Sequence, residues 1–179
     1  MIYNSVAEIY EAINKTRSKL ISTAENLTEE QKNSRENGQG WTAPEIIEHL
    51  GIVEGGLVGM FEKLLAKAES AGEGVKSDGS LNPPISFLEI AEVAKDKKFD
   101  APERMLPQGT QSVTESLIKL QENRNRLNDL RPRIEAADLT NSMFPHPAFG
   151  NLNLYQWLAF IGLHEYRHLM QIERILGKT

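Results

Sequence analysis

Apolar residues return at steps of three and four along most of this sequence, a period that is typical of amphipathic helices. The pattern is held over four long stretches, residues 5–27, 42–70, 112–135 and 154–176. Ser5 and Thr42 are each followed three residues later by a glutamate, which is the spacing of a helix-capping box, and Gly177 follows the last stretch as a C-terminal stop. Four such helices predict an all-α fold, a four-helix bundle.

Two segments break the helical pattern. Residues 71–110 form a long excursion between the second and third helices, with a short capped helix predicted over Phe87–Lys95. An excursion of this length covers one end of a bundle or lines a site. Residues 138–153 are predicted to be a loop, because no alternating strand pattern occurs. The length of 179 residues, without an internal repeat, predicts one domain over residues 1–179.

The composition limits the kinds of partner and chemistry. A net charge of −5 argues against a nucleic-acid-binding surface, which is normally basic. The sequence has neither a signal-peptide pattern nor an apolar run of the roughly 18–20 residues that a membrane span needs. It has no cysteine, so a metal must be held by His, Asp or Glu, and a cysteine nucleophile is excluded. We expect a cytoplasmic protein with no membrane or nucleic-acid partner.

Two histidines, His164 and His168, stand four residues apart in the last predicted helix. This spacing places both rings on one helix face, close enough to bind one metal ion. With Glu165 the segment also spells H-E-x-x-H, the helix motif of zinc peptidases. That motif needs a third ligand downstream, but only 11 residues follow His168, and their one acid, Glu173, projects from the opposite face. We therefore reject the peptidase hypothesis and treat Glu165 as an ordinary helix residue rather than a hydrogen-bond partner of the ligands.

His49 is the predicted third ligand. It projects from the predicted core face of the second helix, which also carries Ile46 and Val53. Each buried imidazole needs polar partners, so three of them on facing helices favour a metal site, although unrelated core histidines stay as an alternative. Three ligands leave coordination positions open, as a catalytic metal requires, and imidazoles suit Zn²⁺, Ni²⁺, Fe²⁺ or Cu²⁺. Such an ion activates either water or a thiol supplied by a cosubstrate.

Three segments around these histidines carry a family resemblance. They read W-T-A-P-E-I-I-E-H-L at 41–50, A-P-E followed by a proline at 101–107, and H-P-A-F-G…Q-W-L…H…R-H…Q-I at 146–172. Together they resemble the DinB-like (DinB/YfiT) superfamily over nearly the whole chain. The resemblance implies a four-helix bundle, His49, His164 and His168 as ligands of zinc or nickel, and a homodimer. It also implies the activities of relatives, which include S-transferases and isomerases that use bacillithiol, mycothiol or glutathione, and metal-dependent hydrolases.

We therefore expect a divalent-metal-dependent enzyme, with zinc ahead of nickel, that activates a low-molecular-weight thiol for transfer to a small electrophile. The alternatives are a metal-dependent hydrolase of a small ester or amide, and a non-catalytic metal-binding stress-response module. Arg124, His146 and Gln171 are candidates for the wall of a small-molecule substrate pocket. Their simpler interpretations are an arginine at the bundle rim with its head in water, a loop histidine and ordinary packing.

Overall fold

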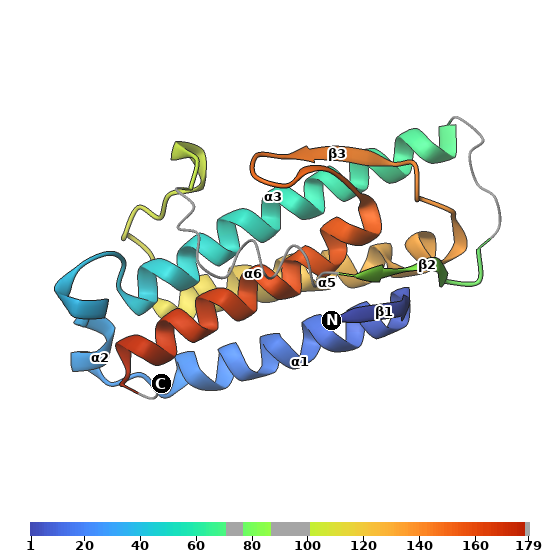
Figure 1. The fold of residues 1–179 in the computed structure, drawn as a ribbon. Helices are drawn as coiled ribbons and strands as arrows, with labels where there is room; N and C mark the ends of the chain where they lie inside the picture. Colours follow the sequence, from blue (N-terminus) through green and yellow to red (C-terminus); the bar gives the residue numbers. More distant parts are fainter. Residues whose placement is uncertain (71–76, 87–100, 178–179) are drawn as a thin grey trace.

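The structure is a computed structural model, and it describes residues 1–70, 77–86 and 101–177. In these ranges four long helices lie side by side (Figure 1): α1 Val6–Glu25, α3 Ala43–Ser70, α5 Val113–Ala136 and α6 Leu154–Ile175. The predicted four-helix bundle is therefore confirmed, and each of the four predicted long helices begins and ends within two residues of the observed bounds. None of the helices in the described ranges has both the length and the hydropathy that crossing a membrane requires.

Polar side chains fix where the long helices begin. The Ser5 hydroxyl accepts the N–H of Glu8, in the first turn of α1, at 3.2 Å. Ahead of α3, the Thr42 N–H donates to the Glu45 carboxylate at 2.7 Å, and the Glu45 N–H donates back to the Thr42 hydroxyl at 3.4 Å. Ser112 and Asn153 form the same reciprocal arrangement ahead of α5 and α6. These bonds satisfy donors that the first turn of a helix leaves unpaired.

Short elements connect the long helices. They are α2 (Glu29–Asn33) and the 3-10 turn η1 (Glu36–Gly38) before α3, strand β2 (Ser80–Ser86) and η2 (Glu103–Met105) before α5, and strands β3 (Met143–His146) and β4 (Gly150–Asn153) before α6. Strand β1 (Ile2–Ser5) pairs antiparallel with β2, and β3 pairs with β4 as a hairpin. The prediction of a strandless loop over 138–153 is wrong, because strands of four residues are too short for alternation to show. The short helix predicted at Phe87–Lys95 lies outside the described residues.

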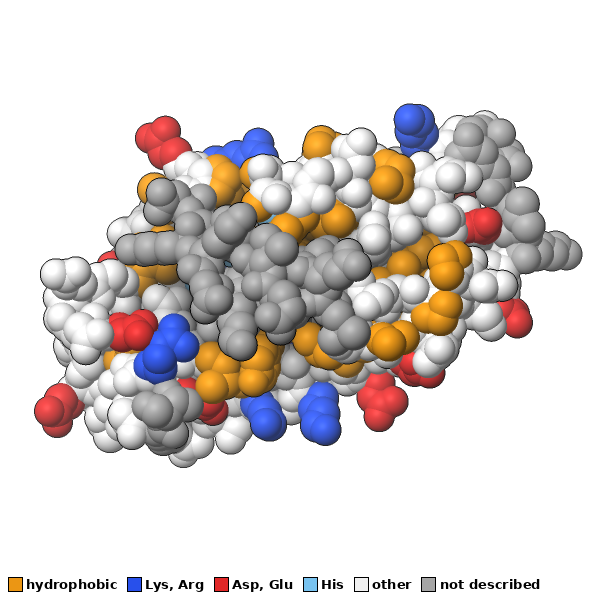
Figure 2. Space-filling view, viewed as in Figure 1, with side chains coloured by type: hydrophobic (Ala, Val, Ile, Leu, Met, Phe, Trp, Pro, Cys, Tyr) orange, Lys and Arg blue, Asp and Glu red, His pale blue; other side chains and the backbone are white. Residues whose placement is uncertain are grey.

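The apolar core is divided into two clusters along the length of the bundle. The cluster toward β1 and β2 includes Ile13, Val58, Leu127 and Ile161. The cluster toward α2 includes Leu20, Leu50, Leu120 and Leu169. Between the two, every long helix carries one buried charged residue, and we call the set the ionic layer: Arg17, Glu54, Arg124 and Glu165. The charged side chains visible on the face in Figure 2 stand instead mostly along its outline.

Two of the predicted helix faces are wrong in detail. On α3 the fully buried side carries Val58 and Phe61, whereas Val53 is only partly buried. On α6, Tyr155 and Ala159 lie on the side of Glu173, which the helical period places opposite the histidines, and yet both are buried. The chain that follows α5 covers this side of α6, and the Tyr155 hydroxyl donates to the Ala137 carbonyl at 2.7 Å. A single-face prediction fails for α6 because other elements cover it on more than one side.

Gly162 lies where α6 comes very close to α1. A Cβ atom added there would stand 2.8 Å from Cγ2 of Ile13, closer than real Cβ contacts allow. We expect Gly162→Ala to lower the free energy of unfolding by about 1–3 kcal/mol, because overpacking displaces neighbours. Gly59 is the matched control: it is also helical, and an added Cβ meets nothing within 4 Å among the described residues. Gly59→Ala should therefore stabilise by up to about 1 kcal/mol. Urea unfolding measures both, and a stabilised Gly162→Ala protein would contradict the close contact.

Candidate metal centre

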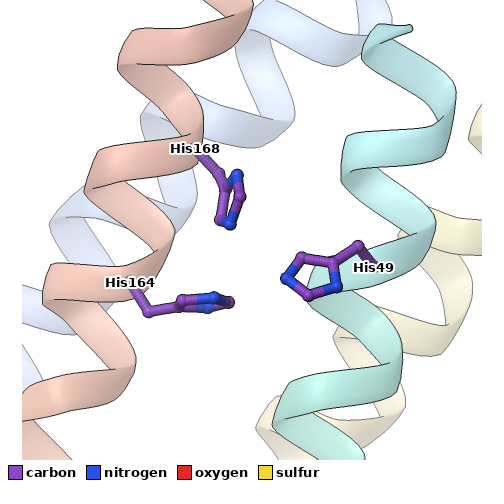
Figure 3. A group of neighbouring side chains, drawn as sticks. All are labelled: His49, His164 and His168. Carbon is purple, nitrogen blue, oxygen red and sulfur yellow. The ribbon is translucent and has the colours of Figure 1, made fainter. Parts of the chain in front are cut away.

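Three histidine rings meet between α3 and α6. His49 comes from α3, His164 and His168 come from α6, and one ring nitrogen from each lies within 4.8 Å of the others. The centroids of the rings are 4.7, 4.9 and 5.3 Å apart. Figure 3 shows the rings pointing toward one another from the two helices. The structure thus brings the three predicted ligands together, and their binding of a metal stays a prediction.

Hydrogen bonds orient two of these rings. Nδ1 of His49 lies 2.7 Å from the carbonyl oxygen of Met105, and Nδ1 of His168 lies 2.9 Å from Oε1 of Gln171. Because both partners are acceptors, each Nδ1 carries the proton, and each Nε2 keeps a lone pair for a metal. Gln171, predicted to line a substrate pocket, therefore holds a ligand histidine in place.

The segment that carries Met105 is itself tied to α3. Glu48 is 4% exposed, and its carboxylate accepts the N–H of Gln108 at 3.2 Å and that of Gly109 at 2.9 Å. A buried carboxylate that accepts two backbone bonds is well satisfied. Glu48 thereby fixes the chain that supplies the acceptor for the neighbouring ligand, His49.

Burial keeps the three imidazoles in the neutral form that a metal needs. Withdrawal from water lowers the pKa of His168 to about 4, with a further contribution from the nearby His49. Burial also lowers the pKa of His164 well below its usual value, and the neighbouring His168 and His49 add to the shift. The pKa of His49 is lowered for the same reason, opposed by its bond to Met105. At neutral pH all three rings keep their lone pairs.

A divalent transition metal fits this donor set. Zinc–nitrogen bonds of about 2.0–2.1 Å in a tetrahedral site place the ligand nitrogens roughly 3.4 Å apart. The nitrogens of the three histidines lie within 4.8 Å of one another, so side-chain movements of about 1 Å bring them to that spacing. Three neutral imidazoles would leave further coordination positions for a substrate or water.

Aromatic rings flank the histidines. The ring of Trp41 lies 4.8 Å from His49 and 6.3 Å from His168, between centroids. Phe160, one turn before His164 on α6, stacks on it at 5.7 Å with an angle of 26° between the rings. These rings supply an apolar environment, in which a charge on a bound ion acts more strongly than it does in water.

His146 does not join the three ligands. It lies at the end of β3, and its ring packs on Phe160 at 4.8 Å and on Trp157 at 5.1 Å. Its Nδ1 accepts the N–H of Ala148 at 3.0 Å. Phe160 thus contacts both His146 and His164. The prediction that His146 lines a substrate pocket stays a prediction.

The ionic layer lies next to the histidines and changes the interpretation of two residues. Arg17 bonds to Glu54 and, at 2.5 Å, to Glu165; Arg124 bonds to the same two carboxylates at 3.0 and 3.2 Å. All four residues are 2–4% exposed. The interpretation of Arg124 as a rim residue with its head in water is therefore corrected, because it is buried among ion pairs. Its role on a substrate-pocket wall stays a prediction. Glu165 is likewise not an ordinary helix residue, and it turns to two arginines rather than to the metal ligands.

Electrostatics favour the charged form of Arg17. Burial alone would lower the pKa of Arg17, but the carboxylates of Glu165 and Glu54 outweigh it and raise the pKa. The third guanidinium nitrogen of each arginine is bonded as well, because Arg17 donates to the Leu120 carbonyl at 2.9 Å and Arg124 to the Asn14 side-chain oxygen at 2.9 Å. Buried charges persist in proteins when they are paired and hydrogen-bonded in this way.

Four residues that support the site were missed in the sequence: Arg17, Glu48, Glu54 and Met105. Arg17 and Glu54 interrupt apolar helix stripes, which is the same signal that singled out Arg124. When the stripes of all four helices are compared, two arginines and two glutamates are found at interrupting positions, and opposite charges of equal number suggest ion pairs. Met105 acts through its backbone carbonyl, so no side-chain pattern points to it.

The lowered histidine pKa values predict how the metal-free protein responds to pH. The unfolded chain takes up protons below about pH 6.5, whereas the folded rings stay neutral, to about pH 4 for His168. Stability that is complete above pH 6.5 is therefore lost as the pH falls, by up to about 1.4 kcal/mol per pH unit for each histidine. Urea unfolding between pH 7 and 5 should show this slope, and His168→Gln should reduce it. An equal slope in both proteins would contradict the assignment.

Comparisons with known proteins agree with the fold and with the resemblance. A sequence model described as the DinB superfamily matches residues 12–172. The uncharacterized protein YuaE of Bacillus subtilis (strain 168) is 26% identical over 175 residues, which cover 92% of this chain and 95% of that protein. A crystal structure of TT2238, described as a four-helix bundle protein, superposes with a TM-score of 0.63 at 20% identity, over 93% of this chain and 97% of that chain. The match over most of the sequence shows that the chain belongs to the DinB superfamily.

Proposed function

We propose that the chain is a divalent-metal-dependent enzyme that activates a low-molecular-weight thiol for transfer to a small electrophile. The observation that carries the proposal is the convergence of three neutral imidazoles on one point. Membership of a typically metal-binding superfamily supports the metal. Zinc is the proposed ion and nickel the second choice, because an all-imidazole set suits both. The homodimer and the cytoplasmic location expected from the sequence also stay proposals.

The residues of the chain would divide the work. His49, His164 and His168 would hold the ion, and the Met105 carbonyl and Gln171 keep two of the rings oriented. When bound, the ion supplies Lewis acidity that lowers the pKa of a thiol. That thiol would come from a cosubstrate, because the chain has no cysteine. Trp41 and Phe160 provide apolar surface beside the site, which limits the access of water.

The metal site can be tested without a substrate. Protein purified without a histidine tag should bind one Zn²⁺ or Ni²⁺ per chain in competition with a chromophoric chelator. Because His49→Ala removes a ligand, it should weaken the affinity by more than about 100-fold, beyond the loss typical of outer partners. His146→Ala is the matched control and should bind as the wild type does, since His146 is not among the three histidines whose nitrogens converge. Unchanged affinity of the His49→Ala protein would show that the site is wrong.

The reaction type can be tested with the metal-loaded protein. We expect it to consume a model electrophile only when bacillithiol, mycothiol or glutathione is added, and chromatography with mass detection identifies the thioether product. The His49→Ala protein serves as the background. Ester or amide cleavage without thiol would instead support the hydrolase. A metal-loaded protein that is inactive in both assays would favour the non-catalytic module.

A further inference from the structure

The ionic layer sits at a place where apolar residues would serve stability as well. On each helix its member is flanked by core residues three or four positions away, for example Leu50 and Val58 around Glu54. Withdrawing charges from water is costly, and apolar residues of similar volume often replace buried ion pairs without loss of stability. A role beyond holding the bundle together therefore accounts better for four charges at one level.

The layer connects the two helices that carry the histidines. Glu54 follows His49 by five residues on α3, and Glu165 directly follows His164 on α6. Both arginines bond to both carboxylates, so each arginine bridges α3 and α6. Sliding α6 by one turn, about 5.4 Å, would break these bonds and leave charges unpaired in the core. The ion pairs therefore fix the position of α6 along α3. The same relative position determines where His49 lies with respect to His164 and His168.

A small cavity brings the layer into contact with His164. It offers about 10 Å³ of free space and is lined by Arg17, Glu54, Glu165 and His164, together with apolar side chains. His49 and His168 have hydrogen-bond acceptors for Nδ1, whereas His164 makes ring contacts and no hydrogen bond within the described residues. A cavity of this size takes one water molecule when polar groups line it. Histidines that bind metals almost always donate their second N–H to a carboxylate, a carbonyl or water.

We propose that the ionic layer is the positioning element of the metal site. It sets the register of α6 against α3, and through one water molecule in the cavity it gives His164 the acceptor that the other two ligands already have. The inference rests on the three-histidine metal of the proposed function. The residues of the layer act through the histidines and do not themselves touch the ion.

A paired substitution separates positioning from stability. Arg17→Met with Glu165→Leu removes one positive and one negative charge and leaves the Arg124–Glu54 pair, whose Nε–Oε1 distance is 3.0 Å. The variant should unfold at a temperature equal to or above that of the wild type, yet bind Zn²⁺ at least about tenfold more weakly. The visible spectrum of bound Co²⁺ should change as well. The matched control is Arg126→Met with Glu62→Leu, an exposed pair between α5 and α3, which should bind as the wild type does.

Two further measurements keep the outcomes distinct. In the metal-free wild type, imidazole nitrogen spectra should show one tautomer for His164, and in the paired variant both tautomers. Val53→Ile adds a methyl group to the lining of the cavity and keeps all four residues of the ionic layer. It should also give both tautomers of His164. This variant tests the inference if the paired variant does not fold. The inference would be overturned if the folded variants kept the zinc affinity, the cobalt spectrum and the single His164 tautomer of the wild type. Absence of metal binding by the wild type would overturn the proposed function, while the tautomer spectra still judge the layer.

Discussion

Four charged side chains with almost no access to water decide how the helices of this bundle can fit together. Arg17 and Arg124 each bond to Glu54 and Glu165, and the remaining guanidinium donors reach Leu120 and Asn14. All four charges are paired only when the helices keep one register along the axis of the bundle. Any other register leaves an unpaired charge in an apolar cluster, which lowers the stability of the fold by several kcal/mol. Apolar side chains alone tolerate sliding far better, because one methyl group packs much like another.

The histidines lie between two different environments. On one side are the ion pairs and the small polar cavity that touches His164. The histidines also contact the rings of Trp41 and Phe160, which supply apolar surface. A bound ion would thus sit in an apolar setting while its ligands are oriented by a backbone carbonyl and an amide. Two long packed helices carry all three rings, so the site needs little rearrangement to form.

The sequence predicted the parts of the fold that depend on local patterns. Helix stripes and capping residues such as Thr42 are local, and the four long helices were placed closely from them. The hairpin around His146 was missed, because a pair of four-residue strands gives no periodic signal. The partners of Glu165 were missed for a different reason. They come from α1 and α5, and only the packing of the helices shows that a glutamate beside two histidines turns away from them.

Arg124 shows the limit of judging one helix at a time. On its own stripe it was indistinguishable from an arginine whose head reaches water. The meaning of its position depends on Arg17, Glu54 and Glu165, each of which interrupts the stripe of another helix. The predicted ligands His49, His164 and His168 came together because two of them are local neighbours and the third lies on the helix that faces them.

The two oriented ligands differ in how they can change over evolutionary time. His168 depends on the side chain of Gln171, so one codon change removes its acceptor. His49 depends on the main-chain carbonyl at position 105, which every amino acid possesses. Selection can therefore vary the side chain at 105 freely while retaining this support, and only a change in the path of the backbone, such as the loss of its anchor at Glu48, would abolish it. The acceptor of His49 is therefore insensitive to substitution of the residue that supplies it, whereas the acceptor of His168 is lost when Gln171 is replaced by a residue without a side-chain oxygen.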